Sequence, residues 1–378
     1  MIYSICQGID DIAIADWKDL NQSNNPLLSY EFFSALEACG CAGPNTGWLP
    51  NHLALKDQGG SLLGVCPLYL KDNSYGELVF DWAWADAYQR NGFQYYPKLV
   101  SCIPFTPVTG SRLFAKNVDS MELLAQGLLA ITEQKNLSSC HVLFARHEEI
   151  ELLQRFGFMP RMGVQYHWHN RAYRDFEDYL DVFSSRKRKN VLKERAKAKS
   201  HGLSIEQVLG RDADEKQWEA IYQFYCITFE QKGGWATLNR SFFFRIRKTL
   251  GAQILLHLAK EGERYVAGAL LFFDDECLYG RHWGCTQHYD ALHFELCYYM
   301  GLEFAINHGI SRFEPGAQGE HKISRGFEPT ATWSAHWIQE PGFRLAIQRY
   351  LDQETSQMRL MISELIKTLP FKRESILE

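Results

Sequence analysis

The two halves of this chain carry the same order of secondary-structure signals, and this repetition limits the possible folds most strongly. Residues 52–70 and 254–273 each predict a β-hairpin, with two apolar runs separated by a short polar turn. In both halves a predicted helix and a short apolar strand follow, ending at Phe144 and at Phe313. A Gly-Phe pair and a proline come next, within residues 156–160 and 325–329. We therefore predict two copies of one α/β unit, each with a mixed sheet and helices on its faces.

The predicted domains cover residues 1–172 and 173–378, which agrees with the two or three domains expected for 378 residues. The second domain contains a predicted basic helix at residues 185–200 and a C-terminal helix. A helix over residues 291–308, capped by Asp290, is predicted to be buried because it is apolar on most sides.

Composition excludes several classes of protein. The net charge of −5 gives no global nucleic-acid signal, so any anion binding must be local. The ten cysteines form no CxxC pair and the histidines lack metal-ligand spacing, which predicts reduced thiols and no metal site. The start of the chain lacks a basic signal-peptide region, and its apolar runs are too short to span a bilayer. We therefore expect a cytoplasmic protein without a transmembrane segment.

Residues 313–329 combine three glycines and two prolines with closely spaced polar groups, and they directly follow the last predicted strand. Glycine and proline disfavour regular helix and strand, so an irregular loop is predicted. Its polar side chains belong to Glu314, Gln318, Glu320, His321, Lys322 and Arg325. Such a loop at a strand end favours a binding or catalytic site, although a solvated surface loop is the alternative.

A basic run occupies residues 186–199, with eight Lys or Arg side chains and one acidic residue, Glu194. In a helix, Lys189, Lys193 and Lys197 share one face, where like charges repel unless a polyanion lies opposite. Phosphates of a cofactor, a tRNA or a lipid headgroup would fit. A solvated helix face is the alternative interpretation.

Two further segments each leave two interpretations open. Residues 283–290 join a predicted strand to a predicted helix, where free amides favour phosphate, but an ordinary turn is equally compatible. The aromatic and proline-rich residues 95–110 predict either the wall of an apolar groove or plain core packing.

Six segments carry a resemblance to a known family. They are residues 95–98 (YYPK), 104–110 (PFTPVTG), 183–190 (FSSRKRKN), 280–284 (GRHWG), 292–295 (LHFE) and 313–322 (FEPGAQGEHK). Over nearly its whole length the chain resembles the FemAB-like N-acyltransferases, a peptidoglycan biosynthesis or recognition family of the GNAT superfamily. The resemblance implies two tandem GNAT-like domains. It also implies acyl transfer from acyl-CoA or, as in the Fem branch, aminoacyl transfer from tRNA to peptidoglycan precursors. The usual GNAT pyrophosphate motif, Arg/Gln-x-x-Gly-x-Gly/Ala, is absent between Trp283 and Phe294.

The leading hypothesis is therefore an N-acyltransferase with no bound cofactor, which uses acyl-CoA or aminoacyl-tRNA as co-substrate and an amine as acceptor. Glu314 or His321 is the predicted base, with Glu320 orienting it. The other predicted site residues contact the reacting groups (His282, Gln318), hold an anion (Lys322, Arg325, Arg186, Lys187, Lys189) or bind substrate (Trp283, His293, Tyr96, Lys98). The site is expected in the second half, facing a cleft between the halves. The alternative is a non-catalytic module that recognises an anionic peptide, glycan or nucleic acid.

Overall fold

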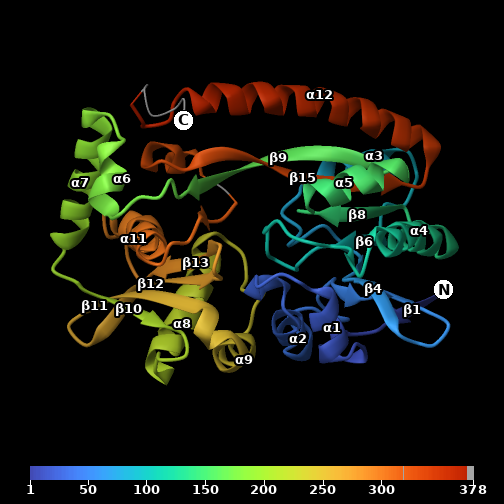
Figure 1. Cartoon of the computed structure of the whole chain (residues 1–378), viewed down its shortest axis with the longest axis horizontal. Coiled ribbons are helices and arrows are strands. Elements are labelled where there is room, and N and C mark those ends of the chain that lie inside the picture. The colour runs from blue at the N-terminus through green and yellow to red at the C-terminus, as the bar shows by residue number, and fades with distance from the viewer. Residues whose placement is uncertain (318, 373–378) are drawn as a thin grey trace. The chain divides into compact units, whose positions relative to one another are not determined.

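The computed structural model describes residues 1–317 and 319–372, which form a mixed α/β fold as predicted (Figure 1). Contacts divide the chain into two units. Unit 1 comprises Met1–Ser23, Leu27–Val164 and Ala331–Met361, and unit 2 comprises Asn24–Pro26, Gln165–Thr330 and Ile362–Glu378. The chain leaves unit 1 within strand β9 (Met159–His169) and returns to it within β15 (Glu328–Ile338). The predicted boundary at residue 172 stays a prediction.

Unit 2 is built on one sheet that contains the predicted hairpin. Its strands follow the order β10 (Ser204–Leu209), β11 (Ile254–Glu261), β12 (Arg264–Phe273), β13 (Cys277–Cys285), β14 (Arg312–Glu314) and the end of β9. Neighbouring strands are antiparallel except β13 and β14, which are parallel. That parallel pair is short, because only residues 277–279 of β13 pair with β14.

Helices cover both faces of this sheet. α8 (Glu215–Gln231) packs so closely on β13 that a Cβ on Gly284 would lie 2.1 Å from the Phe224 carbonyl oxygen, and α9 (Arg240–Leu250) packs beside α8. The opposite face carries α11 (Met300–Asn307), whose Gly301 lies against Leu278 and Phe313 in the apolar core. α6 (Phe176–Asp181) and α7 (Ser185–Lys199) lie outside α11 (Figure 1).

The predicted helix over residues 291–308 forms, but it is not uniform. It consists of α10 (Leu292–Phe294), a π-helical turn η4 (Glu295–Tyr299) and α11. The expected cap is wrong, because Asp290 does not cap it: Ala291, with φ of 64°, is the N-cap residue and makes no side-chain cap hydrogen bond. A π-turn holds one extra residue and so changes which side chains face the sheet; such turns often occur at functional sites.

Unit 1 contains two sheets. One has the order β1 (Ile2–Cys6), β3 (His52–Lys56), β4 (Leu62–Cys66), β7 (Phe114–Ala115). In the other, β2 (Leu49–Pro50), β5 (Tyr69–Lys71), β6 (Lys98–Ser101) and β8 (Ser139–Leu143) are followed by the end of β15. The single strand predicted over residues 62–70 is wrong: it is divided into β4 and β5, which belong to different sheets. Pro67 lies between them, where its missing N–H interrupts a strand ladder.

The helices of unit 1 are α1 (Ile14–Leu20), α2 (Tyr30–Ala38), α3 (Trp82–Arg90), α4 (Val118–Gln134), α5 (His147–Arg155) and most of α12 (Pro341–Ile366). The predicted Ser29 cap of α2 is confirmed, since its side chain accepts from the Phe32 amide. α4 connects β6 to β8, the parallel strand pair of this unit. In the described part of the chain, no helix combines the length and apolar character needed to cross a bilayer.

Candidate functional site

A cavity of about 70 Å³ lies in unit 2 where β13 and β14 stop pairing. Beyond Tyr279, β13 continues through Gly280 to a register shift, while β14 ends at Glu314, directly before Pro315. Pro315 is close enough that a Cβ on Gly280 would lie 3.1 Å from its Cα. The cavity is lined by Ala269, Leu270, Leu271, Gly280, Arg281, His282, Trp283, His293, Cys297, Tyr298 and Pro315.

The glycine-rich segment after β14 is more regular than predicted. Residues Glu320–Arg325 form a short 3-10 helix, η5, and they bury Lys322, Ile323 and Arg325. The prediction of a wholly irregular loop is therefore wrong. The glycines are still required, because Gly316, Gly319 and Gly326 have φ of 95°, 111° and 85°.

A hydrogen bond connects η5 to the cavity wall. The hydroxyl of Tyr298, a cavity residue on η4, lies 2.9 Å from Nε2 of His321. The His321 side chain is exposed, but its partial desolvation lowers its pKa, as do the nearby Arg325 and Lys322 charges, which favours the neutral imidazole at pH 7. A neutral His321 can accept a proton from the Tyr298 hydroxyl.

Lys322 is the unusual charge of this site. Its side chain is only 2% exposed, and Nζ donates to the carbonyl oxygen of Gly316 at 2.6 Å. No carboxylate of the described residues lies within ion-pair distance of it, and burial lowers its pKa to about 8. Lys322 does not line the cavity, but the residue before it in η5, His321, is hydrogen-bonded to the cavity residue Tyr298. A buried ammonium without a counterion can stabilise an anion or a developing oxyanion.

The two predicted histidines that line the cavity are neutral. Burial lowers the pKa of His293 to about 4, with smaller effects from the His321, Arg325 and Lys322 charges. His282 has a pKa well below its usual value, because of burial and the Arg281 charge. The His293 ring lies 5.2 Å from that of Trp283, so predicted residues 282, 283 and 293 all come together at this cavity.

Other predicted residues lie elsewhere. Arg325 forms a two-point ion pair with Glu194 of α7 at 2.8 and 3.1 Å, so its charge is already balanced. Glu320 is exposed, and Gln318 falls outside the described residues. The predicted cations Arg186, Lys187 and Lys189 lie in the first turns of α7.

Glu314 lies on the opposite face of the sheet from the cavity. Its neighbour Phe313 packs towards α11, so strand alternation directs Glu314 to the other face, where Oε1 accepts from Nε of Arg312 at 2.9 Å. Burial raises the pKa of Glu314, although Arg312 partly offsets this effect. Oε2 is buried and has no hydrogen-bond partner among the described residues.

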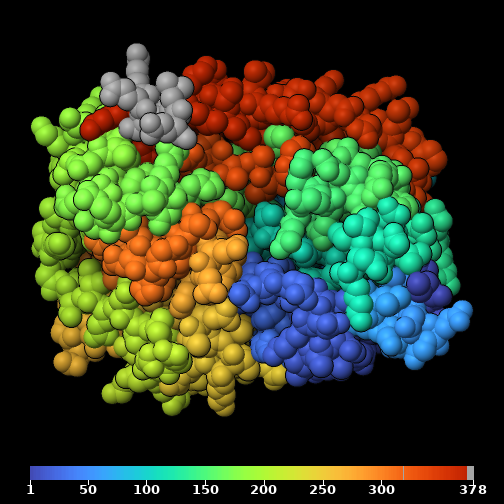
Figure 2. Space-filling model, in the orientation of Figure 1, coloured from blue at the N-terminus to red at the C-terminus, as the bar shows by residue number. Residues whose placement is uncertain are grey.

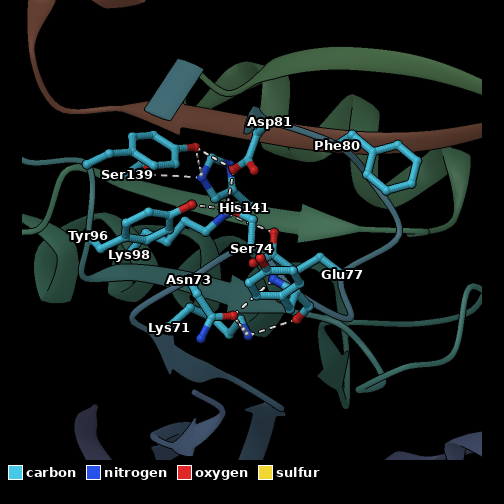
Figure 3. Close-up of polar contacts among 12 residues, drawn as sticks. Lys71, Asn73, Ser74, Glu77, Phe80, Asp81, Tyr96, Lys98, Ser139 and His141 are labelled. Carbon is cyan, nitrogen blue, oxygen red and sulfur yellow. Dashed lines mark hydrogen bonds and ion pairs between the residues drawn. The ribbon is translucent and has the colours of Figure 1, made fainter. Parts of the chain in front are cut away.

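Tyr96 and Lys98 belong to a different cluster, in unit 1 (Figure 3). Lys98 is fully buried, and its Nζ donates to Ser74 Oγ at 2.9 Å, to Glu77 Oε2 at 2.8 Å and to Asp81 Oδ2. Burial lowers the pKa of Lys98, but the two carboxylates raise it more, so it ends above the usual value. The Tyr96 hydroxyl lies 2.8 Å from Ser74 Oγ. These contacts indicate a closed ion-pair network.

The match to a family model extends over residues 8–373, and its description is peptidoglycan biosynthesis/recognition. This chain belongs to the FemAB-like family. A comparison with curated proteins found no match.

Solved structures resemble the fold of this FemAB-like chain at low sequence identity. The structure of FemX is 13% identical, with a TM-score of 0.52, covering 92% of this chain and all of its own. A conserved protein of unknown function from Bacteroides thetaiotaomicron is 9% identical, with a TM-score of 0.53 and coverage of 90% and 100%. The C-terminal domain of a putative lysylphosphatidylglycerol synthetase from Agrobacterium fabrum is 7% identical, with a TM-score of 0.52 and coverage of 88% and 94%.

Sequence reasoning missed several cavity residues of this FemAB-like chain, above all Tyr298 and Cys297. The apolar stretch around them predicted only a buried helix. The π-turn η4 spans both residues, and such a turn leaves no distinct sequence pattern. A tyrosine in an otherwise apolar helix was the one available signal, since a buried hydroxyl needs a partner.

Proposed function

We propose that this chain transfers an acyl or aminoacyl group from an activated ester or thioester to an amine, at the cavity of unit 2. The observation that carries the proposal is the composition of the cavity's edge. The 3-10 helix η5 holds a buried ammonium, Lys322, which has no carboxylate partner among the described residues, and the residue before it, the neutral His321, is hydrogen-bonded to the hydroxyl of the cavity residue Tyr298. Acyl transfer to an amine needs these two functions, an oxyanion stabiliser and a proton acceptor.

In the proposed reaction, the amine nitrogen attacks the carbonyl carbon and the carbonyl π electrons move onto its oxygen. The Lys322 ammonium stabilises this oxyanion, and the surrounding neutral imidazoles leave its charge unopposed. When the carbonyl re-forms, the bond to the donor's sulfur or oxygen breaks and its electron pair stays on that atom. The leaving atom takes up one proton, equal to the one that the amine loses, and departs as a thiol or hydroxyl, while the acyl group remains on the amine.

The proton released by the amine passes to the Tyr298 hydroxyl oxygen, while Tyr298 gives its own proton to Nε2 of His321. The second transfer follows the existing 2.9 Å hydrogen bond between the Tyr298 hydroxyl and Nε2 of His321. The geometry favours His321 over Glu314 as the base, because the Glu314 side chain lies on the other face of the sheet.

The family description directs the choice of acceptor. Amines of peptidoglycan precursors are proposed as the acceptor class, because the family is described by peptidoglycan biosynthesis/recognition. Acyl-CoA and aminoacyl-tRNA are the proposed donors, as the sequence resemblance implies.

The test is a transfer assay with radiolabelled acetyl-CoA and alanyl-tRNA as donors and peptidoglycan-precursor amines as acceptors. We expect His321→Asn to reduce kcat by about a hundredfold, the lower range for losing an acid–base group. Glu314→Gln is the matched control and should retain activity within about threefold, a margin below the range for loss of an acid–base group. Thermal unfolding of both variants shows whether they are folded. Wild-type turnover by His321→Asn, or a loss confined to Glu314→Gln, would overturn the proposed proton path.

A further inference from the structure

The one acidic residue in the basic run of α7, Glu194, connects this helix to both parts of the proposed proton path. Its Oε1 accepts from Nη2 of Arg325 at 2.8 Å, and its Oε2 accepts from Nε of the same arginine at 3.1 Å. Oε2 also accepts from the Tyr299 hydroxyl. Both donors are buried, Arg325 in η5 and Tyr299 in η4. A single carboxylate thus contacts the two short elements that carry His321 and Tyr298.

The Arg325 guanidinium extends this contact to the His321 main chain. Its Nη1 donates to the His321 carbonyl oxygen at 2.6 Å, while Nε and Nη2 bind Glu194. The guanidinium also lies 3.4 Å from the centroid of the Phe294 ring, which is 5.8 Å from the centroid of the His321 ring. A guanidinium is planar and holds its donors in a fixed arrangement. Its orientation on Glu194 therefore determines where the main chain of His321 lies.

Tyr299 extends the contact to Tyr298, its neighbour in the π-helical turn η4. Consecutive residues of a helical turn point in different directions, so Tyr299 reaches Glu194 while Tyr298 lines the cavity. The Tyr298 hydroxyl in turn lies 2.9 Å from Nε2 of His321. The contacts form a closed ring that runs from Glu194 through Arg325 to His321 and returns through the two tyrosines. Both partners of the proposed proton transfer are therefore fixed to one carboxylate.

Other ion pairs already attach α7 to the rest of unit 2. Arg195 donates to both carboxylate oxygens of Glu295 in η4 and of Glu303 in α11. Among the described residues, the hydrogen bonds of Glu303 reach neither Tyr299 nor η5. α7 lies at the left-hand edge of Figure 1 and forms part of the surface in Figure 2. This surface helix thus has ion pairs of its own, and Glu194 adds a connection to η5 that these two pairs do not make.

The Glu194 charge also acts on the His321 imidazole. The described groups whose charge, hydrogen bond or ring faces this imidazole are Glu194 of α7, Tyr298 of η4, His293 of α10, and Lys322 and Arg325 of η5. Partial desolvation lowers the pKa of His321, and the two cations of η5 lower it further, whereas Glu194 raises it. Loss of the Glu194 charge should therefore make His321 a weaker proton acceptor.

We propose that Glu194 is a positioning residue for acyl transfer, which orients the His321–Tyr298 pair through Arg325 and Tyr299 without touching the reacting groups. The inference rests on the proposed function, because it assumes the proton path through Tyr298 to His321. It gives Arg325 a role other than the anion binding expected from the sequence, since its Nη1 and Nη2 are already engaged. A displacement of about 1 Å in a catalytic group can cost a hundredfold in rate, so such a residue affects turnover from a distance.

The test compares Glu194→Gln with the matched control Glu303→Gln. Each variant removes one carboxylate that pairs with an arginine across the α7 contact, and each changes the net charge equally. In the transfer assay, Glu194→Gln should lower kcat by about tenfold and keep KM within about twofold, because displacement of a proton acceptor slows the chemical step and leaves binding intact. Glu303→Gln should keep the wild-type kcat.

A pH profile and nitrogen NMR of the histidines distinguish positioning from a general loss of structure. The acid limb of kcat/KM follows the pKa of the base, so Glu194→Gln should move this limb to lower pH. In the wild type Nε2 of His321 accepts from Tyr298, so the neutral ring carries its proton on Nδ1. Glu194→Gln should give a mixture of both tautomers, with the signal assigned by its loss in His321→Asn. Glu194→Asp keeps the charge and should retain the wild-type acid limb.

Wild-type kcat, acid limb and His321 tautomer in Glu194→Gln would overturn the inference. Equal losses of kcat in Glu194→Gln and Glu303→Gln, with lower melting temperatures in both, would also overturn it and leave Glu194 a structural contact. If Glu194→Gln does not fold, Glu194→Asp decides, because the shorter side chain should still lower kcat; a wild-type kcat would contradict the inference. The proposed function fails separately: if the wild type transfers from no donor but the tautomer changes in Glu194→Gln alone, Glu194 still orients the pair.

Discussion

Each unit contains a parallel strand pair joined by a helix, but the two pairs end differently. In unit 1, the end of β8 is covered by the fully buried Arg112, whose Nε donates to the Leu143 carbonyl at 2.9 Å. The Glu149 carboxylate in turn accepts from the Arg112 and Leu113 amides. In unit 2, the same kind of strand end opens into the cavity, and the segment that follows β14 carries Lys322 in η5.

The buried lysines show the same contrast. Lys98 of unit 1 has two carboxylate partners and a raised pKa, whereas the one partner of Lys322 among the described residues is a carbonyl and its pKa is about 8. Removing one partner of a buried ion pair destabilises the fold, whereas a buried charge without a partner itself costs stability and points to another role. Burial alone therefore does not distinguish a structural lysine from a functional one; the partners of its ammonium group do.

The largest effect is expected for Lys98→Met. The change leaves Asp81 and Glu77 buried without their cation, so the free energy of unfolding should fall by about 3–5 kcal/mol in urea denaturation. The double variant Lys98→Met/Asp81→Asn removes one of the orphaned charges and should recover part of the loss. Unchanged stability of the single variant would remove the contrast between the two lysines.

Lys322→Met should show the reverse pattern. Removing a buried ammonium that has no counterion in the described part of the chain should leave thermal stability unchanged or slightly raised. Turnover should fall by about 10²–10³-fold, the range for losing one oxyanion donor. Steady-state kinetics and a melting curve on the same preparation check both parts. A strongly destabilised but active variant would give Lys322 the structural role that we assign to Lys98.

The pH dependence should separate the lysines further. The pKa of Lys322 is depressed to about 8, so its charge, and with it turnover, should be lost as pH rises through 8. Stability should change in the other direction. Between pH 8 and about 10.5 the unfolded state binds more protons than the folded state, so the free energy of unfolding should rise. Lys322→Arg should abolish the alkaline fall in turnover, and persistence of that fall would assign it to another group.

The sequence allowed prediction of the strand and helix order where patterns were strong. The β11–β12 hairpin, α8 and the basic α7 all form close to their expected bounds. Pro67 could be seen in the sequence as a break in the first hairpin. The sequence did not show that the two parts belong to different sheets, because a single proline does not indicate which strands pair. β15 and α3 were not predicted, because the aromatic residues in these segments follow neither the two-residue period of a strand nor the 3.6-residue period of a helix.

The candidate site could be predicted only in part. Glycine spacing pointed to the segment after β14, where His321 is hydrogen-bonded to the cavity residue Tyr298 and Lys322 is buried; their role in a site stays a prediction. Sequence reasoning did not predict that Arg325 would pair with Glu194, which is 131 residues away along the chain. The sequence also could not show on which face of the sheet Glu314 lies, because a shift of one residue in strand register moves every side chain to the other face.

The smallest effect is expected for Gly280→Ala, which tests whether the open strand end of unit 2 holds the acyl group. The added methyl would lie 3.1 Å from the Pro315 Cα and would narrow the cavity without entering the apolar core. Transfer should then shift towards shorter acyl groups, by about tenfold in kcat/KM for each methylene that no longer fits. Competition between acetyl and butyryl donors measures the shift. Gly43→Ala is the matched control, because a Cβ at Gly43 has no neighbour within 4 Å. If both variants kept the wild-type preference between acetyl and butyryl donors, the acyl group would lie outside this cavity. The open strand end of unit 2 would then not explain acyl transfer.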